Sequence, residues 1–554
     1  PILMNMSNAE YHAKEDISAS DLKSWVKTCP KVWHQLKYGD GRVDHAPVVK
    51  KAFRDGELAH AFTLEPERSA KDYVICPNKT TKAGKAAAEE IIAQVPRSSD
   101  KDVDMAVKAA KSAWKNWKIL GSLDMRDLMR EVAVKSRSYD HEIAKIIAAE
   151  SGKPLIECLD EIEWVASIFE YYSEIGRDQR GRVVAPVTPR SMSMVVKEAY
   201  GVVGCIVPWN YPLLLMAWKV APALAAGNTV VVKPSEITPL SIMIWLEKCC
   251  DHLPNGILNM VTGNGETGAA LVEHPDTRVI AFTGSVDTGK KIASMAATQL
   301  KKTSLELGGN DPIIICDDVD IEIAAKGTAW GGLLNAGQVC TSLERVFVME
   351  SIADSFIEAV VEEAKNVRLG DPLNGKTDMG PMVSLAQLEI TEAKVKQAKQ
   401  EGARLLCGGN RPRHFDKGYF FQPTVFDKVE SDMSMMNIET FGPIIPIQKI
   451  KTLNEAIDLA NNSIYGLGCN IYTNDMEKAL TAADDIKAGS FWINDPLTDN
   501  EAAPFGGMKM SGGGRELGIE GLDEFRESKH ILIDYKIRKK DYWFPYNLEE
   551  GRKT

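Results

Sequence analysis

The residue in this chain best suited to nucleophilic chemistry is Cys340, in the run Asn-Ala-Gly-Gln-Val-Cys-Thr-Ser at 335–342. A cysteine attacks as its thiolate, and an ordinary thiol pKa of about 8.5 leaves only a few per cent ionised at neutral pH. Backbone N–H groups or a nearby cation would raise that fraction. One cysteine among ten could equally be a small core residue, so the surrounding sequence must decide between the two interpretations.

Two other stretches provide groups that a reactive thiol needs. The run Thr-Ser-Leu-Glu-Leu-Gly-Gly at 303–309 places the carboxylate of Glu306 on a short apolar strand that two glycines close. The run Pro-Trp-Asn-Tyr-Pro at 208–212 is a rigid loop that carries the side-chain amide of Asn210. These neighbours favour a chemical role for the thiol over a structural one.

Several motifs then occur in one order along the chain: PWNYP, VVVKPSE, FTGSVDTG, LELGG, NAGQVC, ETFGP and PFGGMKMSGGGRE. With them, the region from about residue 89 to about residue 535 resembles the NAD(P)-dependent aldehyde dehydrogenase superfamily, closest to its betaine-aldehyde and broad-specificity branches. The resemblance is specific, because separate motifs appear in the family's order. It implies an α/β fold with two doubly wound parallel-sheet domains and a small β oligomerisation element.

The resemblance implies that the chain oxidises an aldehyde to the carboxylate with NAD⁺. Cys340 would attack the carbonyl, and the Asn210 amide and the Cys340 N–H would hold the resulting oxyanion. Glu306 would then activate water to hydrolyse the thioester. An acylating enzyme would pass the thioester to coenzyme A instead, and the presence of Glu306 speaks against that alternative.

The family's cofactor contacts map onto several of these motifs. Lys233 and Glu236 would bind the adenosine ribose, and Glu236 favours NAD because its charge would repel a 2′-phosphate. Glu439 and Phe441 would hold the nicotinamide ribose and flank its ring. The GSVDTG turn opens a helix, so its amides can face a pyrophosphate. The remaining predicted contacts are Trp209, Ser235, Gly284, Ser285, Gly289 and Leu307.

Two phosphate-binding motifs occur in forms that we interpret differently. Residues 263–268 spell GxGxxG after an expected strand, but a lone match of this kind is weak, and we predict a plain turn between strand and helix. Residues 284–291 nearly spell a nucleoside-triphosphate loop. That match fails at its last position, where Ser or Thr should hold Mg²⁺. We predict no metal site.

The aldehyde itself is not identified by the sequence. Tyr211, Trp218 and Phe505 are the predicted lining of the aldehyde channel. A cage for a trimethylammonium group needs more aromatic faces than these. Leu334, six positions before the thiol, replaces an aromatic residue of the plant betaine-aldehyde enzymes, which weakens a betaine-aldehyde assignment.

Composition restricts the partners and the compartment. The net charge of −11 argues against nucleic acid as the main partner. Ten cysteines show no CxxC pair and no zinc spacing, so reduced thiols in the cytoplasm fit best. The most apolar stretch, 213–226, is interrupted by Lys219, so we expect no membrane span. The resemblance implies a homodimer or homotetramer.

Strands alternating with helices predict a doubly wound parallel sheet. Strands are expected at 201–207, 228–233, 257–261 and 278–282, with a hairpin at 180–200. The predicted domains are an NAD-binding domain at 89–179 and 201–308, a catalytic domain at 309–508, an oligomerisation element at 180–200 and 524–537, and a tail at 538–554.

Residues 1–88 differ from the rest and resemble the start of exodeoxyribonuclease VIII-like nucleases. Gly56 and His60 match that family's Gly-x-x-x-His step, but the nuclease carboxylates do not follow. The dehydrogenase's own N-terminal hairpin is expected to be missing, with only 89–96 remaining, as in a fusion near residue 88. This leaves two alternatives open: a catalytically impaired or non-enzymatic dehydrogenase-like chimera, and a DNA-processing protein.

Overall fold

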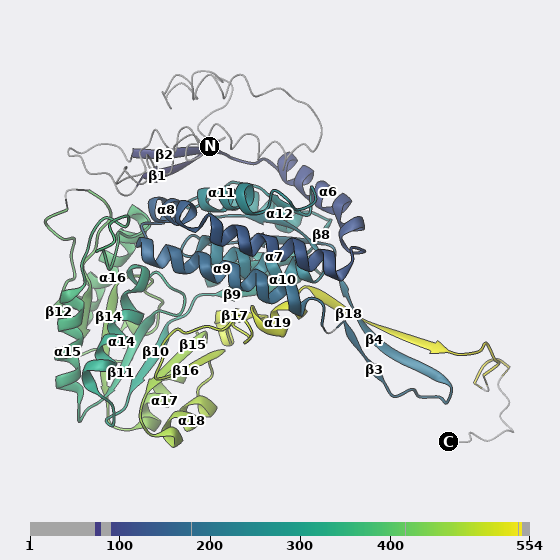
Figure 1. The fold of residues 1–554 in the computed structure, drawn as a ribbon. Coiled ribbons are helices and arrows are strands. Elements are labelled where there is room, and N and C mark those ends of the chain that lie inside the picture. Colours follow the sequence, from purple (N-terminus) through teal and green to yellow (C-terminus); the bar gives the residue numbers. More distant parts are fainter. Residues whose placement is uncertain (1–72, 79–89, 179, 416, 541, 546–554) are drawn as a thin grey trace, which may run out of the picture.

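The computed structural model describes residues 73–78, 90–178, 180–415, 417–540 and 542–545. They form two layered α/β bodies and a β arm that projects away from both (Figure 1). The arm and the two sheets correspond to the predicted fold class.

The first body is built on a six-stranded sheet in the order β17-β9-β8-β5-β6-β7. Five strands run parallel, and the short β17 pairs antiparallel with β9 at the edge. Both faces are covered by helices, so the central strands are continuous apolar runs. The four predicted strands all form, within two residues at each end. The strands are β5 (Val202–Ile206), β6 (Thr229–Lys233), β7 (Leu258–Met260), β8 (Thr277–Gly284), β9 (Lys302–Leu307) and β17 (Gly512–Gly513).

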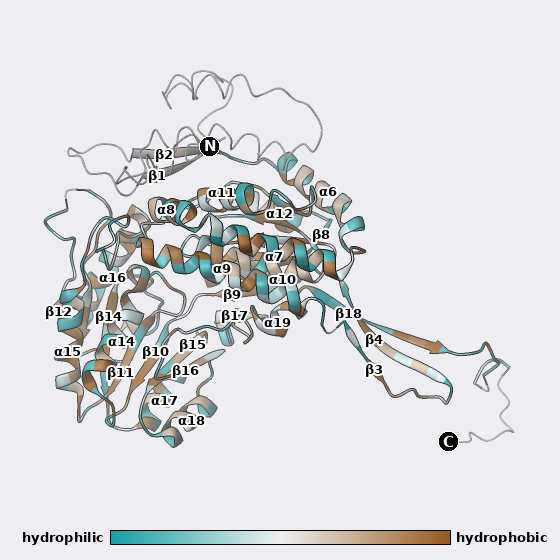
Figure 2. Cartoon of the chain, in the orientation of Figure 1, coloured by the Kyte–Doolittle hydropathy of each residue, from teal (hydrophilic) through white to brown (hydrophobic). Residues whose placement is uncertain are grey.

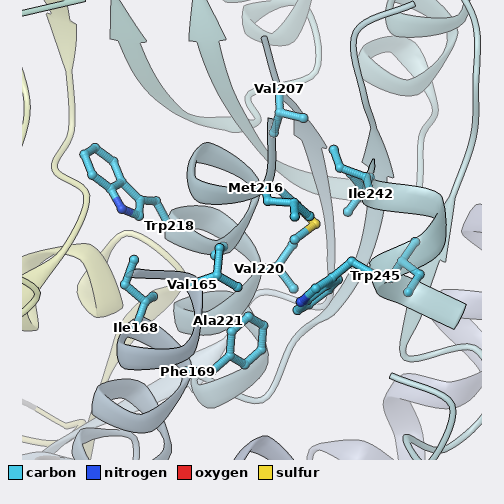
Figure 3. Packing of buried hydrophobic residues seen from close by; sticks show 14 of the residues in the cluster. Val165, Ile168, Phe169, Val207, Met216, Trp218, Val220, Ala221, Ile242 and Trp245 are labelled. Atoms are coloured by element: carbon cyan, nitrogen blue, oxygen red, sulfur yellow. The ribbon is translucent and has the colours of Figure 1, made fainter. Parts of the chain in front are cut away.

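Helices cover this sheet and enclose a large apolar core. Ser99 begins the first of them with a capping box, and Gly152, at φ +86°, ends the third in the left-handed conformation. Figure 3 shows part of the core, where Phe169, Val220 and Trp245 lie among other buried side chains. The helices are α6 (Asp100–Trp117), α7 (Ser122–Ser138), α8 (Asp140–Ser151), α9 (Leu155–Ile175), α10 (Pro212–Ala225), α11 (Leu240–Cys249), α12 (Gly265–Glu273) and α13 (Val286–Ala297).

The second body has a seven-stranded sheet in the order β12-β13-β14-β11-β10-β15-β16, parallel except for the edge strand β12. Its central strands are mainly hydrophobic, and its outer helices also carry hydrophilic residues (Figure 2). The strands are β10 (Asp311–Ile315), β11 (Leu343–Met349), β12 (Arg404–Cys407), β13 (Thr424–Asp427), β14 (Ile444–Ile450), β15 (Gly468–Tyr472) and β16 (Ser490–Ile493). The helices are α14 (Ile321–Leu333), α15 (Ala353–Asn366), α16 (Leu385–Glu401), α17 (Leu453–Asn461) and α18 (Met476–Asp485).

The arm is one three-stranded antiparallel sheet. The hairpin β3 (Gly181–Val184) and β4 (Ser191–Ala199) pairs with β18 (Arg526–Asp534), which follows helix α19 (Gly518–Asp523). The two segments predicted as an oligomerisation element, far apart in the sequence, therefore form one structure. No helix within the described ranges is both long enough and apolar enough to cross a bilayer.

The N-terminal boundary differs from the prediction. Strand β1 (Tyr73–Asn78) pairs antiparallel with β2 (Glu90–Pro96), so a hairpin crosses the expected junction near residue 88. The Tyr-Val-Ile run at the start of β1 is strand-forming, and a strand needs a partner for its backbone groups. The prediction that only 89–96 remained therefore missed the first strand. Gly56 and His60 lie outside the described residues.

Candidate active site

The predicted nucleophile follows a strained turn. The 3₁₀ element η2 (Leu334–Gly337) links α14 to the Cys340 segment, and Asn335, Ala336 and Gly337 have φ of +47°, +57° and +70°. Left-handed backbone is costly for Asn and Ala, and such strain persists only where surrounding contacts impose it. A Cβ on Gly337 would lie 2.2 Å from the Gly442 oxygen, so only glycine permits this approach.

Hydrogen bonds from the PWNYP loop hold the turn. The Asn210 side-chain amide donates to the Gln338 carbonyl at 3.1 Å, and the Asn335 side chain donates to the Asn210 carbonyl at 3.2 Å. The Gln338 amide donates to the Asn335 carbonyl at 2.9 Å. Asn210 and Cys340, far apart in the sequence, are thereby brought to one place.

Glu306 lies beside the same segment, at the end of β9. A Cβ on Gly309 would lie 2.4 Å from the Cys340 carbonyl oxygen, so the LELGG strand end packs directly on the nucleophile segment. Glu306 is 2% exposed, and neither carboxyl oxygen makes a hydrogen bond of ordinary length and angle with the described residues, although interactions with the Thr283 hydroxyl and the Cys340 thiol favour its ionised form. Burial, reinforced by the Glu516 carboxylate, raises the pKa of Glu306 to about 8.

The thiol does not have the environment that the sequence suggested. Burial, followed by the charges of Glu306, Asp311 and Asp499, raises the pKa of Cys340 well above its ordinary value. No cation opposes them among these causes, so the resting thiol is protonated. A base must therefore take its proton before it can attack. The Cys340 backbone N–H has no acceptor among the described residues.

A buried ion pair that the sequence analysis did not assign lies next to Glu306. The Lys219 ammonium group contacts Glu516 and donates to the Thr283 hydroxyl, each at 2.5 Å. Both charged side chains are buried. The sequence signal was present: a lysine inside the otherwise apolar helix α10 is rarely buried without a partner. The partner lies 297 residues away and could not be found from periodicity.

The predicted adenosine-side residues meet at one edge of the six-stranded sheet. Lys233 ends β6 and lies 3.4 Å from the Glu236 carboxylate, which is half exposed. Gly284 ends β8, and the Ser285 hydroxyl caps α13 by accepting the Thr288 N–H. The Ser235 hydroxyl accepts the Ile237 N–H. Gly289 packs closely on Leu307, since a Cβ on Gly289 would lie 2.5 Å from the Leu307 side chain.

The predicted nicotinamide-side residues come from the other body. The Glu439 carboxylate accepts the Gly309 N–H at 3.1 Å, which ties the ETFGP loop to the LELGG strand end. The Phe441 ring packs edge-on against Trp209, with ring centroids 5.3 Å apart and planes at 87°. The two predicted cofactor regions therefore flank the Cys340–Glu306 pair.

Known proteins match this arrangement along most of the chain. Residues 76–531 match the family model described as "Aldehyde dehydrogenase family". The chain belongs to the aldehyde dehydrogenase family. An aminoaldehyde dehydrogenase of Pisum sativum, described as peroxisomal, is 41% identical over 464 residues, 82% of this chain and 92% of the relative. A chloroplastic betaine aldehyde dehydrogenase of Beta vulgaris is 39% identical over 495 residues, 88% of this chain and 96% of the relative.

The solved structures agree. Betaine aldehyde dehydrogenase from Staphylococcus aureus in complex with NAD⁺ is 34% identical with a TM-score of 0.84, covering 94% of this chain and 99% of that one. This aldehyde dehydrogenase is thus an oxidoreductase that oxidises aldehydes with NAD. The α13 N-terminus, the Lys233–Glu236 pair and the ETFGP loop suit that dinucleotide, since they provide amides, a half-exposed carboxylate that can accept hydrogen bonds from hydroxyl groups, and an aromatic face.

The dehydrogenase's predicted substrate residues fall into two groups. Trp218 and Phe505 are both buried and pack with ring centroids 4.9 Å apart. The face of Tyr211 carries Lys153, whose ammonium group lies 3.6 Å from the ring centroid. Lys153 therefore occupies the face of the Tyr211 ring that was predicted to line the aldehyde channel, and the sequence analysis did not predict this contact. Asp499, also missed, is partly buried in the loop between β16 and Phe505.

Proposed function

We propose that this aldehyde dehydrogenase acts on positively charged aldehydes, with Cys340 as nucleophile, Glu306 as general base and the Asn210 amide in the oxyanion site. The observation that carries the catalytic assignment is the Glu306 carboxyl, which is buried, packed beside the thiol segment and interacts with the Cys340 thiol itself. A catalytic base needs a pKa near the working pH, and that of Glu306 is raised to about 8.

In the first step Glu306 takes the proton of the buried Cys340 thiol. The thiolate then bonds to the aldehyde carbon, and the oxygen of the thiohemiacetal receives hydrogen bonds from the Asn210 amide and the Cys340 N–H. One donor of this kind contributes roughly 3–4 kcal/mol to the transition state. NAD, when bound, supplies the hydride acceptor that turns the thiohemiacetal into a thioester.

Glu306 releases the thiol proton before the second step, in which it takes a proton from water whose oxygen attacks the thioester carbon. The C–S bond then breaks to give a carboxylic acid and the Cys340 thiolate, the acid proton passes to the thiolate, and the carboxylate leaves. We propose that the proton held by Glu306 leaves through Thr283, Lys219 and Glu516. The hydrogen bond between Lys219 and Thr283 and the ion pair of Lys219 with Glu516 support this path.

The cofactor roles are part of the same proposal. Lys233, Ser235 and Glu236 would bind the adenosine ribose, and the turn Gly284–Ser285 with Gly289 and Leu307 would face the pyrophosphate. Glu439, Phe441 and Trp209 would hold the nicotinamide half. The support is the meeting of parallel strand ends at this edge, where open α/β sheets bind ligands.

The positive charge of the substrate is inferred from Asp499. Its carboxyl is partly buried, its negative charge acts on the Cys340 thiol, and burial raises its pKa to about 7. A cationic substrate would keep this carboxyl ionised and would gain from it. The relatives named for aminoaldehydes and betaine aldehyde favour the same class. Trp218 and Phe505 would line the apolar part of the channel.

The test of the substrate class compares matched aldehydes by kcat/KM from NADH formation. Aminopropanal is paired with propanal, and betaine aldehyde with its neutral tert-butyl analogue. The cationic member of each pair should be preferred about tenfold, and Asp499→Asn should remove most of that preference. Equal kcat/KM values within both pairs would contradict the proposal.

The nucleophile is tested with Cys340→Ala, which should abolish aldehyde oxidation and ester hydrolysis but leave NADH binding intact. Dehydrogenase activity retained in the purified variant would contradict the assignment. A parent protein without NADH formation or ester hydrolysis would instead favour the catalytically impaired chimera. Mg²⁺-dependent degradation of linear duplex DNA that His60→Ala removes would favour the DNA-processing alternative.

Assembly and compartment complete the proposal. The β3–β4–β18 arm exposes Val183, Leu532 and Ile533, as expected if it pairs with another copy in a homodimer or homotetramer. The eight cysteines from Cys158 to Cys469 are free thiols, which suits the reducing cytoplasm. Two relatives are described as peroxisomal and chloroplastic. Imaging of a tagged protein in cells tests whether this chain lies in the cytoplasm or in an organelle.

A further inference from the structure

Four residues after the thiol, β11 carries a buried carboxylate with no part in the steps above. Glu344 is 2% exposed, and its two oxygens accept the backbone N–H groups of Thr440 and Phe441, each at 2.6 Å. One side chain thus bridges the start of β11 and the ETFGP loop, about a hundred residues later in the chain. Charge-assisted hydrogen bonds of this kind are the strong ones.

The loop needs such a tether. Phe441 has φ +51°, a left-handed conformation that is unfavourable for a non-glycine residue and persists only where surrounding contacts impose it. The hydrogen bonds to Glu344 hold the backbone N–H groups of Phe441 and of Thr440, the residue before it. A second side chain, Gln387 on α16, donates to the Phe441 carbonyl at 2.9 Å. Phe441 is therefore held on both sides of its strained backbone.

The residues that this tether orients are those proposed to hold the nicotinamide half of NAD. Glu439 directly precedes the two tethered amides and accepts the Gly309 N–H, and the Phe441 ring lies against Trp209. Lys394 donates to the Glu439 carbonyl at 2.5 Å from the α16 side. Loss of the Glu344 bonds would free the segment between Glu439 and Phe441 without removing either side chain.

We propose that Glu344 is a positioning residue for the nicotinamide half of NAD, acting through the Thr440 and Phe441 amides. The inference rests on the proposed cofactor roles of Glu439 and Phe441. Glu344 touches neither the thiol nor the aldehyde in this scheme. Its loss should weaken dinucleotide binding while sparing chemistry that needs only Cys340.

The experiment compares Glu344→Gln with the parent by two readouts. Glutamine has one acceptor oxygen, so one amide loses its partner and meets an N–H₂ group instead. NADH binding, followed by fluorescence, should weaken roughly tenfold. Ester hydrolysis measured without cofactor should stay within about twofold. The KM for NAD should rise more than kcat falls.

Two further variants keep the test decisive. Gln387→Ala removes the half-buried second tether and should weaken NADH binding in the same direction by a smaller factor, even if Glu344→Gln fails to fold. Glu401→Gln is the matched control. Its carboxylate accepts the Ser434 N–H at 2.9 Å on an exposed surface just before the loop, so NADH binding should not change.

Glu439→Ala separates this inference from the proposed function. If it binds NADH as the parent does, the cofactor role of the loop is wrong and the Glu344 inference falls with it. If Glu439→Ala weakens binding but folded Glu344→Gln and Gln387→Ala do not, only the inference is overturned. An equal loss of ester hydrolysis and NADH binding in Glu344→Gln would overturn it too, because it would indicate a general scaffold role.

Discussion

Glu306 and Glu344 are two carboxyl groups on either side of the thiol, equally buried but differently surrounded. Glu306 ends a strand of the six-stranded sheet, and neither of its oxygens makes a hydrogen bond of ordinary length and angle with the described residues. Glu344 begins a strand of the seven-stranded sheet and accepts two backbone N–H groups. Both are 2% exposed.

The difference parallels the two roles proposed for these residues, a general base for Glu306 and a positioning residue for Glu344. Burial raises the pKa of Glu306 to about 8, with Glu516 adding to it. Burial also raises the pKa of Glu344, to about 7, although the Thr440 and Phe441 amides oppose the increase. Buried polar groups are normally satisfied, so an unsatisfied one beside a nucleophile marks a functional position.

The largest test of this contrast is Glu306→Gln. The variant keeps shape but cannot accept a proton, so steady-state NADH formation should fall by about two to four orders of magnitude. If another base can deprotonate Cys340, hydride transfer still occurs once in the variant and only thioester hydrolysis is slow. A burst of NADH near one equivalent per site should then precede the slow phase. Stopped-flow absorbance measures both, and unchanged steady-state activity would remove Glu306 from its role.

A smaller effect is expected from the ion pair behind Glu306. The double change Lys219→Met with Glu516→Gln removes both charges together and so avoids leaving one unpaired in the interior. Thioester hydrolysis should slow about tenfold, since the proposed proton path is lost. Lys248→Met with Glu142→Gln, a largely buried Lys–Glu pair between α11 and α8, is the control and should leave the rate unchanged.

Both carboxyls make stability depend on pH in the same direction, because burial raises the folded-state pKa of each, but only Glu344→Gln also leaves a backbone amide unpaired. The folded-state pKa of Glu306 is raised, so its contribution is fully present below about pH 4.5 and is lost as pH rises towards about 8. Glu306→Gln should therefore lose less stability than the parent between these pH values. Glu344→Gln should lose about 1–3 kcal/mol through its unpaired amide. Denaturant melts at both pH values measure this, and identical pH slopes for Glu306→Gln and the parent would contradict it.

The smallest effect concerns a third carboxylate, which is half exposed. Glu236 lies 3.4 Å from Lys233, and its charge should repel the 2′-phosphate of NADP. Glu236→Gln should raise kcat/KM for NADP about threefold to tenfold, because an exposed charge is screened by solvent and salt. NADP use that does not change would show that another group sets the preference.

Local sequence patterns were sufficient for most of the architecture. Apolar runs between turn residues predicted β5, β6, β7 and β8, and the GSVDTG turn was correctly expected to open a helix. These features depend on neighbours within one element, so a single stretch contains the information. The strand β1 was missed because the sequence of residues 1–88 was interpreted through a different family, and strand pairing with β2 was not considered.

The chain alone determined which residues can react: a thiol, a carboxyl, an amide and the residues of the cofactor motifs. Only the tertiary structure decided their ionisation and their partners. Burial, and then the acidic groups that several strands and loops place around it, raise the pKa of Cys340. Lys219 contacts Glu516, which lies 297 residues later in the chain, and Glu344 accepts the Phe441 N–H from 97 residues later. Burial and hydrogen-bond satisfaction depend on what the folded chain places around a group, and no periodicity in the sequence encodes that.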